Sequence, residues 1–269
     1  MSNFLVKMAQ SSQERASMLT DSYTDNVLDH PVYNLEYNGF DLIAEIKNNS
    51  PSEGLLASHK ENRCERAKVY VEAGAAAISV LTEPHFFGGS ISHLKQVIES
   101  IAEKPKPVMC KDFIVDPIQI IQARSVGASG ILLIVTMLSD AKLMSMLACA
   151  REHKLFVLLE CFSRDDISRT CRLLEQTANY EYAHSKKLLI GVNSRNLKTL
   201  EVDPGRFSQL HSFIPDYVNG VAESGLFDSG DIIKTSKLGY KLALVGTALM
   251  RSENPGKLIK DMLLAGRIN

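Results

Sequence analysis

Charged side chains recur in this sequence directly at the ends of short apolar runs. Glu45 and Lys47 close the run at 42–46, Lys111 follows the run at 107–110, and Glu160 closes the run at 156–160. Carboxylates and ammonium groups that lie close together shift each other's pKa, and general acid–base catalysis uses such shifts. Folding alone gives little reason to gather these charges, because each buried ion costs several kcal/mol unless it is paired. The pattern therefore predicts an acid–base site.

Two further runs end in the same way. Asn193 and Arg195 follow the run at 188–192, and Glu223 and Ser224 follow the run at 218–222. Alternate residues of a strand share a face, so Asn193 and Arg195 should point to one side, as should Glu45 with Lys47 and Lys111 with Phe113. A single pair of this kind is equally well an ordinary ion pair at a strand end. Five strand ends together favour a functional cluster.

Glycine-rich turns add a second chemical signal. Gly225 follows one of the charged strand ends, and Gly246 and Thr247 follow the last apolar run at 242–245. Glycine lets backbone N–H groups approach an anion, and barrel enzymes often bind phosphate at these two loops. Each glycine alone is more often a turn residue. The two loops together, with Ser50 from the first loop, predict a phosphate site.

The elements that must position these residues can be recognised as eight apolar runs. They lie at 42–46, 76–81, 107–110, 130–135, 156–160, 188–192, 218–222 and 242–245. None shows strict alternation, as expected for strands buried on both faces of a parallel sheet. The segments between them are long enough for one returning helix each. The sequence predicts a single (β/α)8 TIM barrel, with active-site residues at the carboxyl ends of its strands.

Helix signals support this reading. Helices are expected over 61–74, 116–128, 139–153 and 254–266, with Asp116 as an N-cap before Pro117 and Asn254 before Pro255. Residues 1–40 are read as an N-terminal helical extension packed on the barrel, and 41–269 as the barrel domain. The polar insertion at 177–187 should lie away from the chemistry. An open doubly wound sheet is the alternative, but no G-x-G-x-x-G follows the first run.

Composition narrows the function classes. The chain has 269 residues with 30 Lys and Arg against 31 Asp and Glu, so no basic excess indicates nucleic-acid binding. Five cysteines without a C-x-x-C pair indicate neither a disulfide framework nor a zinc site, and the seven histidines are scattered. We expect no metal, no cofactor and no membrane span, and a cytoplasmic location.

Several segments together resemble the indole-3-glycerol-phosphate synthase family. They are LIAEIKNNSPSEG, PVMCKDFIVDPIQI, GASGILLIV, LIGVNSRNLKTLEVD, VAESGLF and ALVGTALM, and they cover the chain from about residue 41 to residue 264 in the family's order. The combination of EIK-x-x-SPS with KDFI-x-D, GxNxRxL and ESG is highly specific. The resemblance implies closure of an indole ring on 1-(2-carboxyphenylamino)-1-deoxyribulose 5-phosphate, without metal or organic cofactor, in tryptophan biosynthesis. Such barrels are often monomers.

The resemblance also implies roles for individual residues. Lys111 would be the general acid, Lys47 would bind the substrate carboxylate and take part in proton transfer, and Glu160 would act in the dehydration. Glu45, Asn193, Arg195, Glu223 and Ser224 would form the polar shell around them. The apolar wall would comprise Phe87, Phe113 and Leu132, and the phosphate cradle Ser50, Gly225, Gly246 and Thr247. Pro51 and Leu244 would also bind the substrate.

The sequence departs from the family at Glu53, where lysine is frequent, and at Thr247, which replaces a common serine. Two other functions stay open from the residues alone. One is a phosphate-barrel isomerase that uses a Cys/Asp pair, for which Cys110 would be one residue out of register. The other is a barrel that binds sugar phosphates without turnover.

Overall fold

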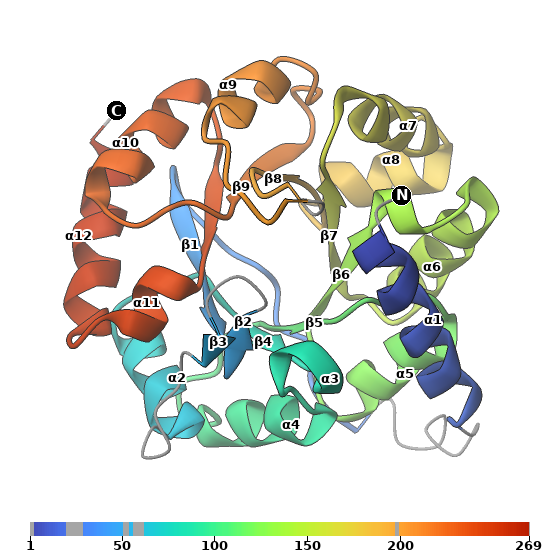
Figure 1. Ribbon diagram of the computed structural model, residues 1–269, viewed down its shortest axis with the longest axis horizontal. Helices are drawn as coiled ribbons and strands as arrows, with labels where there is room; N and C mark the ends of the chain where they lie inside the picture. Colours follow the sequence, from blue (N-terminus) through green and yellow to red (C-terminus); the bar gives the residue numbers. More distant parts are fainter. Residues whose placement is uncertain (1–2, 20–28, 51–53, 56–61, 197–198, 269) are drawn as a thin grey trace.

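Eight parallel strands close into a barrel in the computed structural model, which describes residues 3–19, 29–50, 54–55, 62–196 and 199–268 (Figure 1). Each strand pairs with its sequence neighbours, and the first pairs with the last, so that Ile43 lies opposite Leu244. The strands are β1 Asp41–Ile46, β4 Ala77–Leu81, β5 Val108–Lys111, β6 Gly130–Ile134, β7 Phe156–Cys161, β8 Leu188–Asn193, β9 Asn219–Glu223 and β10 Leu242–Val245. The predicted TIM barrel is confirmed.

A ring of helices surrounds the strands. The outer helices are α2 Arg63–Glu72, α4 Ile91–Ser100, α5 Pro117–Ser125, α6 Asp140–Glu152, α7 Arg164–Leu174, α9 Gly205–His211, α10 Ser229–Leu238 and α12 Pro255–Arg267. Shorter elements lie in the connections: the strands β2 Asn49–Ser50 and β3 Gly54–Leu55, the helices α3 Pro84–Phe87, α8 Thr177–His184 and α11 Thr247–Arg251, and the 3-10 turn η2 Val135–Met137.

The expected caps explain where several helices begin. The Asp116 side chain accepts from the Ile118 N–H, and Gln119 completes a capping box with it. Ser139 and Asn254 cap α6 and α12 in the same way. Each cap satisfies a backbone donor that the helix itself cannot satisfy. These local signals fix where the chain leaves one barrel unit for the next.

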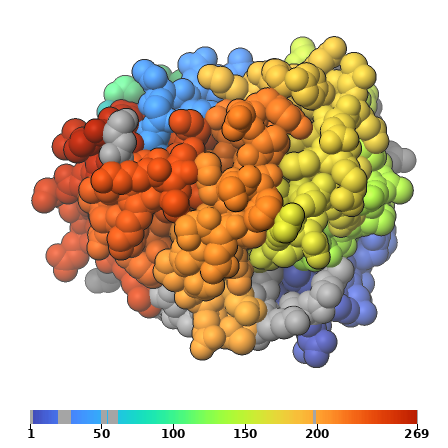
Figure 2. Space-filling model, turned by 90° about the horizontal axis from the view of Figure 1, so that it is seen from above, coloured from blue at the N-terminus to red at the C-terminus, as the bar shows by residue number. Residues whose placement is uncertain are grey.

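The N-terminal segment touches both ends of the barrel. Helix α1 (Asn3–Ser17) packs through Leu5, Met8, Ser12 and Ala16 beside the carboxyl ends of the strands. Before β1, the Tyr33 N–H donates to Ser129 at the start of β6, at the opposite end. Figure 2 shows the dark blue helix at the lower edge and lighter blue residues of the segment before β1 at the upper edge. The expected N-terminal helix is therefore present.

The polar insertion forms its own helix, α8, which leads into the amino end of β8. Tyr182 of α8 is buried and donates to the Ala150 carbonyl at the end of α6. The Lys187 carbonyl accepts from the Val157 N–H at the amino end of β7. These contacts place the insertion at the end of the barrel opposite the charged strand ends. No helix in the described part of the chain is long and apolar enough to cross a membrane.

Candidate active site

One cavity opens at the carboxyl ends of the strands. Its lining includes every candidate residue that the structure describes with a side chain: Glu45, Lys47, Phe87, Lys111, Phe113, Leu132, Glu160, Asn193, Arg195, Glu223, Ser224, Gly225, Leu244, Gly246 and Thr247. Pro51 and Glu53 lie outside the described residues, as does the side chain of Ser50. Residues from β1, β5, β7, β8, β9 and β10 thus meet in one place although they are far apart in the chain.

Glu45 lies between the two lysines of the cavity. The Lys47 Nζ is 2.7 Å from one of its carboxylate oxygens, and the Lys111 Nζ is 3.6 Å from the other. Burial would raise the pKa of Glu45, but the charges of Lys47 and Lys111 outweigh it and leave this pKa below its ordinary value. Glu45 is therefore an ionised carboxylate that holds both ammonium groups in position.

Glu160, at the end of β7, faces Lys111. Its Oε1 accepts a short hydrogen bond from the Asn193 amide, and Asn193 is itself oriented by the Arg195 N–H, which donates to its Oδ1 at 2.8 Å. Burial raises the pKa of Glu160 above its ordinary value despite the opposing charge of Lys111. A carboxyl group whose pKa is raised in this way binds a proton more tightly than an ordinary glutamate side chain and suits a general base.

Glu223 is the least compensated charge in the cavity. It is 1 % exposed, and neither carboxylate oxygen has a hydrogen-bond partner among the described residues. Burial is the main cause that raises the pKa of Glu223 well above the ordinary value, and repulsion from Glu160 raises it further. Gly191 makes room for this group, since a Cβ there would lie 1.9 Å from the Glu223 Oε1. Because Gly191 pairs with Glu160 across the sheet, the two carboxyl groups lie on either side of it.

Replacing Glu223 with glutamine should stabilise the fold. A raised pKa in the folded state means that stability falls as pH rises from the unfolded value towards the folded one. The Glu223→Gln variant should thus gain about 1–2 kcal/mol at neutral pH, and the gain should vanish near pH 4, where both states of the wild type are protonated. Urea unfolding at the two pH values measures this. A Glu223→Gln variant that is less stable than wild type at pH 7 would contradict the claim that the Glu223 carboxylate is an uncompensated charge.

Lys111 is held as a charged ammonium group. Burial lowers its pKa, but the surrounding carboxylates, Glu45 foremost and then Glu160 and Glu223, raise it by more, and the net pKa lies above the ordinary value. Burial alone would lower the pKa of a lysine, because it disfavours the charged ammonium form. Here the charges of three carboxylates outweigh the effect of burial on one ammonium group. Lys111 therefore carries a positive charge into the reaction.

Aromatic side chains form one wall of the cavity. The Phe87 and Phe113 ring centroids are 6.1 Å apart, and the Phe4 ring of α1 packs edge-on against Phe113 at 5.9 Å. The carboxylate of Glu83 holds Phe87 in place by accepting from the N–H groups of residues 85–87 at the start of α3. This wall suits the flat apolar face of an aromatic substrate.

The opposite side of the cavity is built from backbone. Ser224 and Gly225 both have a φ of 68°, so the backbone turns sharply here in the left-handed region. Gly246 precedes α11, and its absent side chain leaves space for Glu45 and Lys47. A Cβ on Gly246 would lie 2.3 Å from the Glu45 Oε1 and 3.0 Å from the Lys47 Nζ. The predicted phosphate end thus lies against the charged cluster.

Adding one methyl group at Gly246 should disturb the close contact of this residue with Glu45 and Lys47. The Gly246→Ala variant must displace either Glu45 or the start of α11, and displacements of about 1 Å can cost about 100-fold in kcat/KM. Steady-state kinetics measures the loss. Gly256→Ala is the matched control, because its Cβ would meet nothing closer than the Val69 side chain at 3.2 Å. Equal kinetics of the two variants would refute the tight fit at Gly246.

Arg195 and Arg206 fix the loop after β8. The Arg195 Nη1 donates to the Leu200 carbonyl at 2.7 Å, and the Arg206 Nη1 donates to the carbonyls of Asn193 and Arg195 at 3.0 and 3.2 Å. Arg206 comes from α9 and was not expected from the sequence. Its role could not be read from spacing, because only the packing of α9 brings it over the strand end.

Other cavity residues were also missed. Phe4, Leu81, Ile134, Leu226 and Phe227 line the cavity although no sequence signal singled them out. Phe4 is part of the expected N-terminal helix, but helical periodicity does not say which barrel residues the helix will cover. Within the described residues no group of three His, Cys, Asp or Glu side chains could hold a metal ion.

The fold and the cavity define a class of protein: a TIM-barrel enzyme whose cavity has acid–base groups, an aromatic wall and a glycine-rich rim. The similarity to solved structures supports the fold and not a particular function. 3-Hexulose-6-phosphate synthase from Salmonella typhimurium matches at a TM-score of 0.65 with 15 % identity over 84 % of this chain and 98 % of that one. Thiamine phosphate pyrophosphorylase from Pyrococcus furiosus matches at 0.59 with 13 % identity over 85 % and 96 %.

Sequence relatives give the particular family. The family model for indole-3-glycerol phosphate synthase matches residues 6–262. The indole-3-glycerol phosphate synthases of Kineococcus radiotolerans and Aquifex aeolicus are each 38 % identical, over 86 % and 84 % of this chain and 78 % and 82 % of their own lengths. The chain therefore belongs to the indole-3-glycerol phosphate synthase family.

Proposed function

We propose that this barrel converts 1-(2-carboxyphenylamino)-1-deoxyribulose 5-phosphate into indole-3-glycerol phosphate, carbon dioxide and water, as its family membership indicates. The observation that carries the residue assignment is the convergence of Lys47, Lys111 and Glu160 on one cavity between an aromatic wall and a glycine-rich rim.

Lys111 acts first in the proposed mechanism. The substrate ring packs on Phe87 and Phe113, and its phosphate binds at Gly225, Gly246 and Thr247. This brings the aromatic carbon against the ketone carbon, and such orientation contributes several kcal/mol to catalysis. As the new carbon–carbon bond forms, Lys111 donates its proton to the ketone oxygen. Its positive charge stabilises that oxygen while negative charge develops there.

Decarboxylation and dehydration follow at the same place. Lys47 holds the substrate carboxylate. When this carboxylate leaves as carbon dioxide, the electron pair of the broken bond returns to the ring. Glu160 then takes a proton from the carbon next to the ring nitrogen and passes it to the departing hydroxyl group, which leaves as water and completes the aromatic indole. Asn193 keeps Glu160 in position for this step. Glu45 holds the two lysines apart at defined distances throughout.

A fluorescence assay tests the proposal. Purified protein mixed with the carboxyphenylamino substrate should produce a fluorescent indole, and carbon dioxide should be released in equal amount. Conversion of phosphoribosylanthranilate instead would favour the isomerase, and binding without turnover would favour a non-catalytic barrel. The isomerase is disfavoured by Cys110, which is 2 % exposed and whose pKa burial raises to about 12.

We also propose that the chain works as a monomer in the cytoplasm. All candidate residues come from a single barrel, so the cavity needs no second copy to be complete. Light scattering in solution gives the mass directly.

A further inference from the structure

Asn193 lies at the end of β8 and holds Glu160 through its side-chain amide. Its side-chain oxygen accepts from the Arg195 N–H at 2.8 Å, so both ends of the amide group are bound. The direction of this amide therefore depends on the backbone of residues 193–196, which are called the β8 end below. Whatever fixes the β8 end also fixes how Glu160 is held.

The backbone N–H groups of the β8 end are all occupied. The Ser194 N–H donates to the Glu223 carbonyl at 2.9 Å, and the Asn196 N–H donates to the Glu201 carbonyl at 2.8 Å. The N–H between them is bound to the Asn193 side chain. No backbone N–H of residues 194–196 is thus left for the carbonyl groups of the same segment, which need a donor from elsewhere.

Arg206 of α9 supplies this donor. Its Nη1 donates to the Asn193 carbonyl at 3.0 Å and to the Arg195 carbonyl at 3.2 Å. The Ser194 carbonyl between them accepts instead from the Asp203 N–H at 2.9 Å. Two carbonyl groups therefore converge on one guanidinium nitrogen, and the segment is held on both sides.

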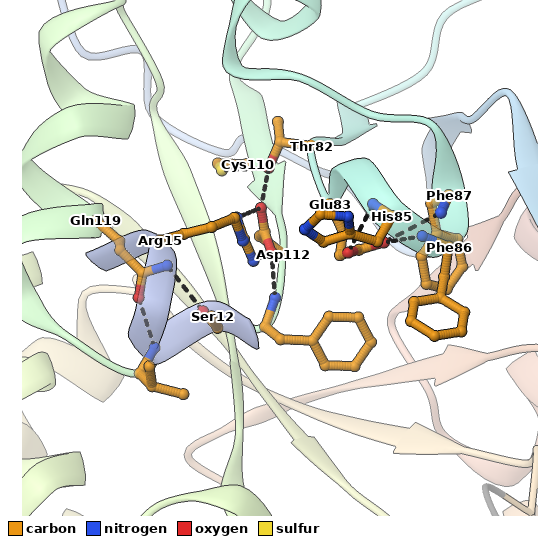
Figure 3. A network of polar contacts seen from close by, with 12 residues as sticks. Ser12, Arg15, Thr82, Glu83, His85, Phe86, Phe87, Cys110, Asp112 and Gln119 are labelled. Atoms are coloured by element: carbon orange, nitrogen blue, oxygen red, sulfur yellow. Dashed lines mark hydrogen bonds and ion pairs between the residues drawn. The ribbon is translucent and has the colours of Figure 1, made fainter. Parts of the chain in front are cut away.

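The end of another strand shows that a residue nearby in the chain can hold such a segment. After β4, the Glu83 carboxylate accepts from the N–H groups of residues 85–87, two to four residues further along the chain (Figure 3). The carbonyl groups of the β8 end are instead bound by an arginine that is 13 and 11 residues further along. The β8 end thus depends on the packing of α9.

Helix formation by itself does not explain an arginine at this place. Arg206 lies in the first turn of α9 (Gly205–His211), at the positive end of the helix dipole, where acidic side chains are favoured and a cation is unfavourable. No acidic residue is present in this turn. The two contacts with the β8 end give the arginine a role that the helix alone does not.

We propose that Arg206 is a positioning residue, which sets the direction of Asn193 and, through it, the orientation of Glu160 for the dehydration step. The inference rests on the proposed function for the role of Glu160. It deepens that function, because it makes the last step depend on a residue that does not line the cavity.

The test compares Arg206→Met with Arg172→Met, the same change at an exposed arginine of α7, in the full-length protein. In a single turnover with carboxyl-labelled substrate, Arg206→Met should release carbon dioxide at close to the wild-type rate. The indole should appear about 10- to 100-fold more slowly, because displacing a catalytic group by about 1 Å has effects of this size. Arg206→Lys should recover part of this rate, since an ammonium group can also donate to carbonyl groups, and Arg172→Met should match wild type.

The pH profile should respond as well, which a merely structural role would not cause. The Asn193 hydrogen bond lowers the pKa of Glu160, so weakening it should raise this pKa and move the acid limb of indole formation to higher pH. Lys111, Glu45 and Glu223 also act on the same carboxyl group, and this variant leaves all three in place.

A double variant and hydrogen exchange give two further readouts. In a Glu160→Gln background, Arg206→Met should slow indole formation no further, because both changes act on one proton transfer. Hydrogen exchange in Arg206→Met should become faster for peptides covering 190–196 and stay unchanged for 108–113. Should Arg206→Met fail to fold, Arg206→Gln carries the same test, since it keeps an amide donor on a shorter side chain.

The outcomes separate the two proposals. A wild-type protein without indole production overturns the proposed function, while the exchange pattern still decides whether Arg206 orders the β8 end. An Arg206→Met variant that forms indole at the wild-type rate overturns the positioning role. Equal slowing of carbon dioxide release and indole formation overturns it too, because the effect would then not act through Glu160.

Discussion

Replacing Lys111 with alanine should lower kcat about 1,000- to 10,000-fold, the range for losing a general acid together with the positive charge that faces a developing oxyanion. The effect is large because Lys111 is the cation shared by Glu45, Glu160 and Glu223, so no neighbouring donor can take its place without leaving a carboxylate unpaired. The initial rate of indole fluorescence measures the loss.

Two further variants separate the charge of Lys111 from its proton. Lys111→Arg keeps a positive charge but binds its proton too tightly to donate it, so it should remain far below wild type while retaining substrate binding. Lys95→Met removes an exposed lysine on α4, at 54 % side-chain exposure, and should be neutral. A Lys111→Ala rate within a few-fold of wild type would end the assignment of this residue as the general acid.

Replacing Glu160 with glutamine should separate the release of carbon dioxide from the formation of the indole in time. If Glu160 takes its proton only after carbon dioxide has left, a single turnover with carboxyl-labelled substrate should still release carbon dioxide. The indole should then appear about 100- to 10,000-fold more slowly, as expected for loss of a general base. Rapid quench for labelled carbon dioxide, run beside fluorescence for indole, measures both. Loss of carbon dioxide release as well would place Glu160 earlier and contradict the proposed order.

The pH dependence offers an independent check on Glu160. Burial raises its pKa, so the acid limb of kcat should lie above the ordinary range of a glutamate side chain. The limb should disappear in Glu160→Gln and remain in the control Glu152→Gln, which alters an exposed residue of α6.

Local patterns in the sequence determined the barrel and the end of it that carries the chemistry. Each strand is buried on both faces and therefore appears as an apolar run, and β7 at Phe156–Cys161 overlaps the run predicted at 156–160. Helix starts at Asp116, Ser139 and Asn254 follow from side chains that bind a donor within the next few residues. Because parallel strands share a direction, charged strand ends had to gather on one rim.

Only the tertiary structure decided which groups meet there. It pairs Glu45 with both lysines and brings Arg15 to Asp112 across 97 residues of chain. It also leaves the Glu223 carboxylate, next to Gly191, without a hydrogen-bond partner in the described part of the chain. Periodicity reports the face of an element but neither its neighbour nor the angle at which a helix docks. Those depend on strand register and on packing summed over the whole barrel, and so the partner of each charge could not be read in advance.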